Sequence, residues 1–201
     1  MKDQDYDDLL NIETGEGQKR FYKSFHYHPY EPTPYSGLEI LFNEYELNKD
    51  DRLVDFGCGK GRLNFYVHNR FQAQVVGIEM NELFFNKAID NLNSYKKKWK
   101  VKREDITFQC CLAEEYQIHE EDNTFYFFNP FSVEIFRKVI HHILQSKEKV
   151  NRGIDLILYY SSYEYLYFLE RETLFELKQE VMIPNLSKRN PYERFLIYHL
   201  S

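Results

Sequence analysis

Hydrophobic and polar residues alternate along the chain with two different periods. Short apolar runs rich in β-branched and aromatic residues are typical of buried strands, and they lie at 53–56, 74–79, 106–111, 123–128 and 154–160. Between these runs, apolar residues recur at helical spacing and predict helices at about 62–71, 81–95 and 133–145. Strands that alternate with helices in this way indicate an α/β fold around a mostly parallel sheet.

The N-terminal part of the chain departs from that alternation. Residues 1–20 are polar and acidic, and we expect them to form a loose arm. Residues 21–47 begin with many aromatic side chains and three prolines, which exclude a regular helix before the helical spacing at 38–45. We therefore expect 21–47 to be a cover segment followed by a helix.

The C-terminal part also changes pattern. A short helical segment begins at Ser161, and two more strands are expected at about 173–181 and 194–200, with a turn between them. No linker divides residues 21–201, and nothing repeats at a fixed period. We therefore expect residues 21–201 to form one domain.

A glycine-rich turn follows the first of the predicted strands. Residues 55–61 read Asp-Phe-Gly-Cys-Gly-Lys-Gly, and a helical pattern begins at Arg62. Glycine is needed where the backbone bends sharply or where a ligand lies directly against it. A dinucleotide fingerprint has its third glycine one position later, and a phosphate loop needs Ser or Thr directly after the lysine. A pyrophosphate is therefore not the expected ligand.

The turn resembles motif I of the class I S-adenosylmethionine-dependent methyltransferases. The resemblance implies that five residues of the turn hold the methionine part of this cofactor, namely Asp55, Gly57, Cys58, Gly59 and Gly61. Glu79 ends the second predicted strand, 18 residues after Gly61, where the family places a carboxylate that binds both ribose hydroxyls. Met80 comes next, at a position that often packs on the adenine ring.

The third predicted strand departs from the family pattern at the adenine site. The family often has an acidic residue directly before an alanine, and this chain has Leu112 before Ala113. The resemblance then implies that backbone groups near Ala113 contact the adenine. Glu114 is a candidate to replace the missing acid as the partner of the adenine amino group.

Asn129-Pro130-Phe131 at the end of the fourth predicted strand resembles motif IV. In amino-methylating members, a polar side chain and the next carbonyl accept hydrogen bonds from the substrate amine, and an aromatic ring stacks on a planar group. The resemblance implies that Asn129 lies beside the cofactor and the transferable methyl, with Pro130 and Phe131 at the substrate. This chain has one proline instead of two, which leaves the substrate class open.

The proline-rich segment before the core supplies further candidates. In many family members such a segment folds over the cofactor, which makes Tyr30 and Thr33 candidate substrate contacts and Tyr35 a candidate catalytic base. Alternatively, these aromatic residues cover one face of the sheet. His26 and His28 have no third ligand nearby, so we expect no metal site.

The composition bears on the cellular compartment of the protein and on the partners that it can bind. The 201 residues carry a net charge of −6, which disfavours nucleic acid as a partner without closing that option. The basic run at 96–103 is better explained as a solvated helix end. Three cysteines make no disulfide framework, and neither a signal peptide nor a membrane span is evident, so we expect a cytoplasmic protein without a membrane partner.

Taken together, these features resemble those of a class I methyltransferase. We expect a doubly wound, seven-stranded mostly parallel sheet with helices on both faces and a C-terminal antiparallel hairpin. The expected cofactor is S-adenosylmethionine, and the acceptor is a protein side chain, a nucleic acid or a small molecule. The alternatives are a non-catalytic S-adenosylmethionine sensor or partner subunit, and a nicotinamide dehydrogenase. The oligomeric state is not predicted.

Overall fold

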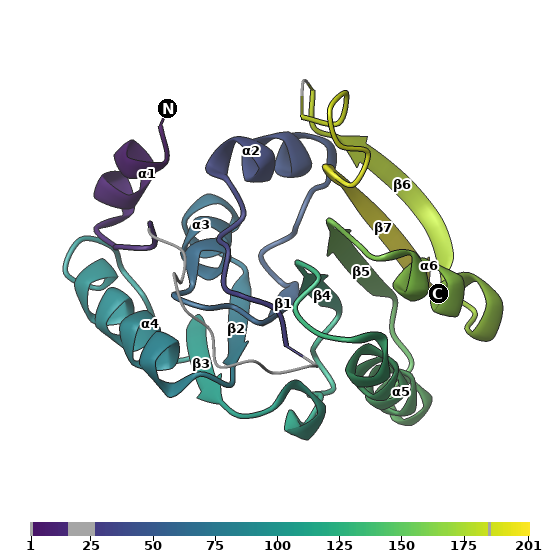
Figure 1. Cartoon of the computed structure of the whole chain (residues 1–201). Helices are drawn as coiled ribbons and strands as arrows, with labels where there is room; N and C mark the ends of the chain where they lie inside the picture. Colours follow the sequence, from purple (N-terminus) through teal and green to yellow (C-terminus); the bar gives the residue numbers. More distant parts are fainter. Residues whose placement is uncertain (1, 16–26, 185) are drawn as a thin grey trace.

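A seven-stranded sheet forms the centre of the protein, in the order β3-β2-β1-β4-β5-β7-β6 (Figure 1). The computed structural model describes residues 2–15, 27–184 and 186–201. The strands are β1 Arg52–Phe56, β2 Gln74–Glu79, β3 Ile106–Cys110, β4 Thr124–Phe127, β5 Ile154–Tyr159, β6 Glu176–Met182 and β7 Arg194–Leu200. β1 to β5 pair in parallel, whereas β7 is antiparallel to β5 and β6. The predicted fold class is confirmed.

Helices cover both faces of the sheet. They are α1 Asp3–Leu10, α2 Tyr35–Glu44, α3 Arg62–Phe71, α4 Glu82–Tyr95, α5 Val133–Lys149 and α6 Tyr163–Glu172, with a short 3₁₀ turn η1 at Ala113–Glu115. Because side chains alternate along a strand, β1 sends Leu53 into the core beneath α2 and α3. Val54 and Phe56 enter the opposite core beneath α5 and α6.

Two boundaries differ from the predicted ones. α5 continues to Lys149, past the predicted end at 145, because its last turn is polar and carries no apolar periodicity. β6 begins at Glu176 rather than at 173, because the Thr173 hydroxyl donates to the Leu169 carbonyl at 2.7 Å and closes the end of α6.

The expected loose arm is wrong for residues 2–15. α1 packs against α2 and α3, and Leu10 at its end is buried. The buried Asp7 carboxylate accepts hydrogen bonds from the Tyr35 hydroxyl and from the backbone and hydroxyl of Thr14. Tertiary contacts therefore order a segment whose own composition is too polar to signal packing. Residues 16–20, and the aromatic residues 21–26 of the cover segment, lie outside the described residues.

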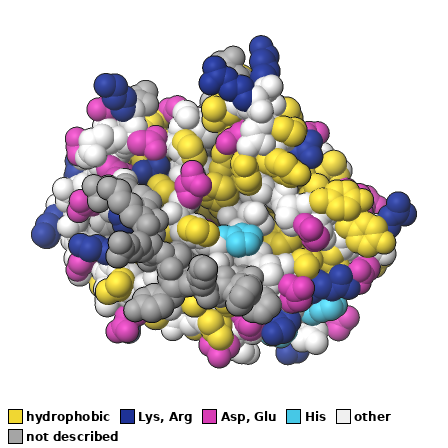
Figure 2. Space-filling view, in the orientation of Figure 1, with side chains coloured by type: hydrophobic (Ala, Val, Ile, Leu, Met, Phe, Trp, Pro, Cys, Tyr) yellow, Lys and Arg dark blue, Asp and Glu magenta, His cyan; other side chains and the backbone are white. Residues whose placement is uncertain are grey.

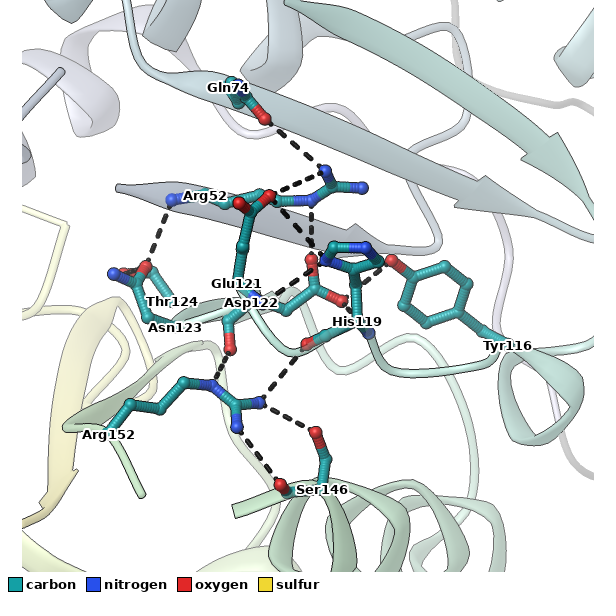
Figure 3. A network of polar contacts seen from close by, with 10 residues as sticks. All are labelled: Arg52, Gln74, Tyr116, His119, Glu121, Asp122, Asn123, Thr124, Ser146 and Arg152. Carbon is teal, nitrogen blue, oxygen red and sulfur yellow. Dashed lines mark hydrogen bonds and ion pairs between the residues drawn. The ribbon is translucent and has the colours of Figure 1, made fainter. Parts of the chain in front are cut away.

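A polar network ties together the sheet end opposite the glycine turn (Figure 3). The buried Asp122 carboxylate accepts from Arg52 Nε at 2.8 Å, from the Tyr116 hydroxyl at 2.9 Å and from the His119 amide at 2.7 Å. Arg152 Nε donates to the Asp122 carbonyl at 2.8 Å, and the same guanidinium reaches Ser146 on α5. The network joins the starts of β1 and β4 to the end of α5.

Charged side chains of both signs lie mainly around the rim of the face drawn in Figure 2, and hydrophobic side chains gather near its middle. The described residues of that face form no broad basic surface. Within the described residues, no helix has the length and apolar composition that crossing a membrane requires.

The chain order places a crevice beside β1. The chain runs outward from β1 through β2 to β3, and then crosses to β4 on the other side of β1. In open α/β sheets, ligands bind where the strand order reverses, outside the carboxyl ends of the strands.

Candidate functional site

A cavity of about 370 Å³ lies at this crevice. Its wall includes ten of the residues that the sequence singled out, Tyr30, Thr33, Asp55, Gly57, Cys58, Glu79, Met80, Ala113, Pro130 and Phe131. Four other predicted site residues do not border it, Tyr35, Gly59, Gly61 and Asn129.

The glycine turn is fixed to the second strand. The amides of Gly57 and Cys58 both donate to the Ile78 carbonyl, at 2.9 and 3.0 Å. Gly57, Gly59 and Gly61 all have positive φ angles, of 82°, 55° and 87°, which L side chains rarely adopt. The sequence argument that this turn needs glycine is therefore correct for the backbone.

Only one of the three glycines faces the cavity. A Cβ on Gly59 would lie 2.0 Å from the Tyr30 ring, which covers it. A Cβ on Gly61 would lie 2.7 Å from the Phe108 ring. The expectation that all three approach a ligand is therefore wrong in this structure, since Gly59 and Gly61 admit neighbouring aromatic rings instead.

Two buried carboxyl groups lie at the inner end of the cavity. Glu79 Oε2 accepts from the Gly59 amide at 2.9 Å, and Oε1 accepts from the Asn81 amide at 2.7 Å. Burial raises the pKa of Glu79, and these backbone hydrogen bonds oppose the rise. Burial raises the pKa of Asp55 well above its usual range, and the charge of Glu79 adds to this. No described residue donates a hydrogen bond to the Asp55 carboxyl group.

Cys58 lies between these acids and also borders the cavity. Burial raises the pKa of its thiol well above the ordinary value, and the charges of Asp55 and Glu79 act in the same direction. The thiol therefore stays protonated at neutral pH and is no nucleophile.

The outer wall near β2 and β3 contains Met80 and Ala113. Met80 is 40% exposed and Ala113 is buried at the start of η1. Glu114 is already engaged, because its carboxylate accepts from the Tyr27 hydroxyl at 2.8 Å and pairs with Lys138 at 3.6 Å. It is not free to replace the missing acid before Ala113.

Residues 27–35, which we call the strap, contribute another part of the wall, from Tyr27 to Thr33. The His28 amide donates to the Pro130 carbonyl at 3.0 Å, and Tyr27 forms an antiparallel bridge with Phe131. Further along, the Tyr30 hydroxyl donates to the Thr14 carbonyl at 3.1 Å. The strap is therefore held both to the end of β4 and to the segment that follows α1.

The loop after β4 is constrained but does not present Asn129 to the cavity. Asn129 has a φ of 40°, and its Oδ1 is enclosed by protein without a hydrogen-bond partner among the described residues. The expected cavity-facing Asn129 side chain is therefore not observed, because the strap packs across this loop. Pro130 contacts the turn, since a Cβ on Gly57 would lie 2.8 Å from Pro130 Cβ.

The candidate base Tyr35 is wrong on geometry. Its side chain is fully buried, and its hydroxyl donates to Asp7 Oδ1 at 2.7 Å. The Arg62 guanidinium stacks on its ring, with 4.5 Å between the guanidinium carbon and the ring centroid. Tyr35 thus belongs to the packing of α1 against α2.

Several cavity residues were not foreseen. They include His28, Arg62, Asn81, Phe84, Tyr126 and Phe128. Phe128 ends a predicted strand, so its place at a carboxyl strand end was a usable signal. His28 and Arg62 reach the cavity through contacts with residues far away in sequence, which no local pattern encodes.

The sheet order and the cavity define the class. A parallel sheet whose last strand enters antiparallel between β5 and β6, with a glycine turn and a strand-end carboxylate around one cavity, is a Rossmann-like methyltransferase fold. The chain belongs to the methyltransferase domain family, whose model, described as "Methyltransferase domain", matches residues 47–168. The predicted family is confirmed, and the dehydrogenase alternative is set aside.

Individual relatives are more distant. A malonyl-[acyl-carrier protein] O-methyltransferase of Bacillus anthracis is 28% identical over 153 residues, which cover 75% of this chain and 52% of that protein. The chain spans about half or less of the length of the curated relatives that it matches.

Two solved structures illustrate the likeness of fold. A putative RNA methyltransferase from Pyrococcus horikoshii aligns with a TM-score of 0.60 and 18% identity, over 98% of this chain and 97% of that one. An RNA methyltransferase from Salinibacter ruber, in complex with S-adenosyl-L-homocysteine, aligns with a TM-score of 0.58 and 19% identity, over 84% and 92%.

Proposed function

We propose that this chain binds S-adenosylmethionine in the cavity and transfers its methyl group to an acceptor. The observation that carries the proposal is the pair of buried carboxyl groups, Asp55 and Glu79, beside the glycine turn. Two acids that burial makes costly to ionise suit a cationic ligand. The family assignment supports the same activity.

The donor set fits this cofactor. Each Glu79 oxygen already accepts one backbone hydrogen bond, which orients the carboxylate and leaves lone pairs for the two ribose hydroxyls. Asp55, to which no described residue donates a hydrogen bond, would take the ammonium group of the methionine part, next to Gly57 and Cys58. Met80 and Ala113 would border the adenine. Gly59 and Gly61 would act indirectly, by shaping the turn.

The bound cofactor supplies an electrophilic methyl group on a sulfonium. The chain's own part is to align the acceptor and to exclude water, which can account for most of the acceleration in a displacement of this kind. Tyr126, Phe128 and Phe131 give the acceptor side of the cavity an aromatic wall. Pro130 would fix the loop between the two ligands, and Thr33 would hold Tyr126, since their hydroxyl oxygens are 2.8 Å apart.

The names of the relatives do not identify the methyl acceptor of this chain, because they differ from one another. Their names give malonyl-[acyl-carrier protein] for one protein and RNA for two others. The aromatic wall suits a planar or apolar acceptor. Nucleic acid stays open as an acceptor of this chain, although its net charge of −6 does not favour it.

A thermal-shift titration tests cofactor binding. We expect S-adenosylmethionine and S-adenosylhomocysteine to raise the Tm of the wild-type chain, and Glu79→Gln to lose most of the shift. The matched control is Glu176→Gln on the exposed strand β6, which should keep it. No shift in the wild-type chain would end the proposal.

The sensor or partner-subunit alternative keeps a specific basis, because Leu112 replaces the adenine acid and the Asn129 oxygen is enclosed. Methyl transfer distinguishes a sensor from an enzyme, because a sensor binds the cofactor without forming S-adenosylhomocysteine. Formation of that product by the wild-type chain rejects the sensor.

A further inference from the structure

His28 has one ring nitrogen fixed by the backbone. Its Nδ1 lies 2.6 Å from the Asn129 carbonyl oxygen. A carbonyl oxygen only accepts hydrogen bonds, so Nδ1 must carry the hydrogen. In the neutral imidazole the lone pair then resides on Nε2. The ring is exposed and borders the cavity, so this lone pair is available to a ligand.

The backbone of His28 fixes its position as well. Its amide donates to the Pro130 carbonyl at 3.0 Å, so backbone and ring hold two consecutive residues of the loop after β4. Pro130 in turn contacts Gly57 of the glycine turn. The imidazole is therefore anchored to the loop after β4, whose Pro130 borders the same cavity as the acid pair.

Neither group that motif IV assigns to an amine acceptor is fully open here, since the Asn129 side-chain oxygen is enclosed and the Pro130 carbonyl has one lone pair left. The resemblance to motif IV assigns amine recognition to the Asn129 side chain and to the next carbonyl. Here the Pro130 carbonyl already accepts from His28, and the Asn129 side-chain oxygen is enclosed. The strap adds a proton-accepting nitrogen beside this loop, on His28.

We propose that His28 is the general base of the reaction and that the acceptor is a hydroxyl group. This inference rests on the proposed function. As the acceptor oxygen forms its bond to the methyl carbon, the carbon–sulfur bond breaks and its electron pair stays on sulfur. The hydroxyl proton moves to Nε2 of His28. The products are the methyl ether, S-adenosylhomocysteine and an imidazolium, which then loses its proton to water.

The sharpest test replaces His28 with Asn. The Asn amide can still donate to the Asn129 carbonyl from the position of Nδ1, but it has no group in place of Nε2. The rate of S-adenosylhomocysteine formation is measured by chromatography, with S-adenosyl-[methyl-³H]methionine as the donor so that tritium marks the acceptor. The reaction is run in buffer alone, with bulk cellular RNA, with bulk cellular protein and with a small-molecule cell extract. The S-adenosylhomocysteine product counts every methyl group transferred, including transfer to water. The control is His141→Asn, on the exposed side of α5 and away from the cavity.

We expect His28→Asn to slow this formation by about 100-fold or more, the usual contribution of general-base catalysis. Its affinity for S-adenosylhomocysteine should stay within about twofold of wild type, well below a tenfold change. His141→Asn should match wild type in both. If His28→Asn keeps the wild-type rate, the base role is rejected while the proposed function stands. If the wild-type chain binds S-adenosylhomocysteine but forms none, the sensor alternative replaces both proposals.

Two further measurements test the chemistry directly. Mass spectrometry of the labelled product should find the methyl group on oxygen, and a methyl group on nitrogen or carbon would reject the hydroxyl acceptor. Nitrogen NMR of the histidine rings, assigned by the loss of one signal in His28→Asn, should find the hydrogen of neutral His28 on Nδ1. A hydrogen on Nε2 would remove the lone pair that the base needs and would reject the base.

Discussion

Asp55 carries a carboxyl group that the fold disfavours in its charged form. Burial raises its pKa, and the charge of Glu79 raises it further. A carboxyl group whose pKa is higher in the folded state holds a proton that the unfolded chain has lost. Its ionisation therefore costs stability as the pH rises above about 3.9, until the folded-state pKa is reached. A cationic ligand would offset this cost.

Asp55→Asn should therefore stabilise the ligand-free protein and weaken cofactor binding. We expect a gain of about 1 to 2 kcal/mol at pH 7, which disappears near pH 3, where the wild-type carboxyl group is protonated in both states. Urea unfolding at the two pH values measures it. Exposed Asp50→Asn is the control and should change little. A variant that loses stability at pH 7 would show that Asp55 is a structural acid.

Gly61→Ala should destabilise the fold without a direct effect on the cavity. The position has a φ of 87°, and a Cβ there would lie 2.7 Å from Phe108 and 2.9 Å from Phe65. We expect a loss of about 1 to 3 kcal/mol in urea unfolding. Gly15→Ala is the matched control, because no atom of the described residues lies within 4 Å of its added carbon. Equal stability of the two variants would contradict the packing argument.

Among the elements, α1 shows most clearly what the sequence pattern does not encode. Its apolar residues are few, and its mean composition is polar, so it was expected to be loose. Its position depends on Asp7, which binds Tyr35 and Thr14, and on the stacking of Tyr6 and Tyr35, with ring centroids 4.5 Å apart. Long apolar periods predicted α3, α4 and α5, whereas buried polar partners become visible only once the chain is folded.

Asp7→Ala should release α1 from the body. Two hydroxyl groups and two amides would lose their acceptor, and we expect a cost of about 2 to 4 kcal/mol. Because the Thr14 carbonyl holds Tyr30 of the strap, the cofactor shift should fall as well. Hydrogen exchange and urea unfolding measure both effects, with exposed Asp8→Ala as the control. Unchanged exchange at residues 3–15 would show that Asp7 does not anchor the helix.

Across the whole molecule, the sheet was predictable and the shape of the cavity was not. Strand–helix alternation and the rule that ligands bind at strand ends correctly placed Asp55, Glu79 and Pro130 together. The strap brings His28 against Asn129, 101 positions further along the chain. Its contacts enclose Asn129 and cover Gly59, and such long-range packing follows from tertiary structure rather than from a local motif.

The loss of folding stability at low pH should depend partly on Asp155, which joins β5 to its neighbours. Burial alone would raise its pKa, but hydrogen bonds from Tyr45, His199 and Lys178 outweigh burial and lower it. The lowered pKa gives stability that is present above about pH 3.9 and is lost as the pH falls through the folded-state value. Asp155→Asn should lower the Tm at pH 7 and differ less from wild type at pH 3. A constant difference between the two pH values would contradict this linkage.

The late position of β7 in the sequence also affects synthesis. Among the described residues, β6 pairs with β7 alone, and β5 meets β7 on one side. Both strands therefore present open edges until residues 194–200 leave the ribosome. During that interval the growing chain exposes backbone groups that invite pairing with other polypeptides. A nonsense codon shortly before Arg194 should therefore yield a product that aggregates or is captured by chaperones, although the turn and the acid pair have already been translated.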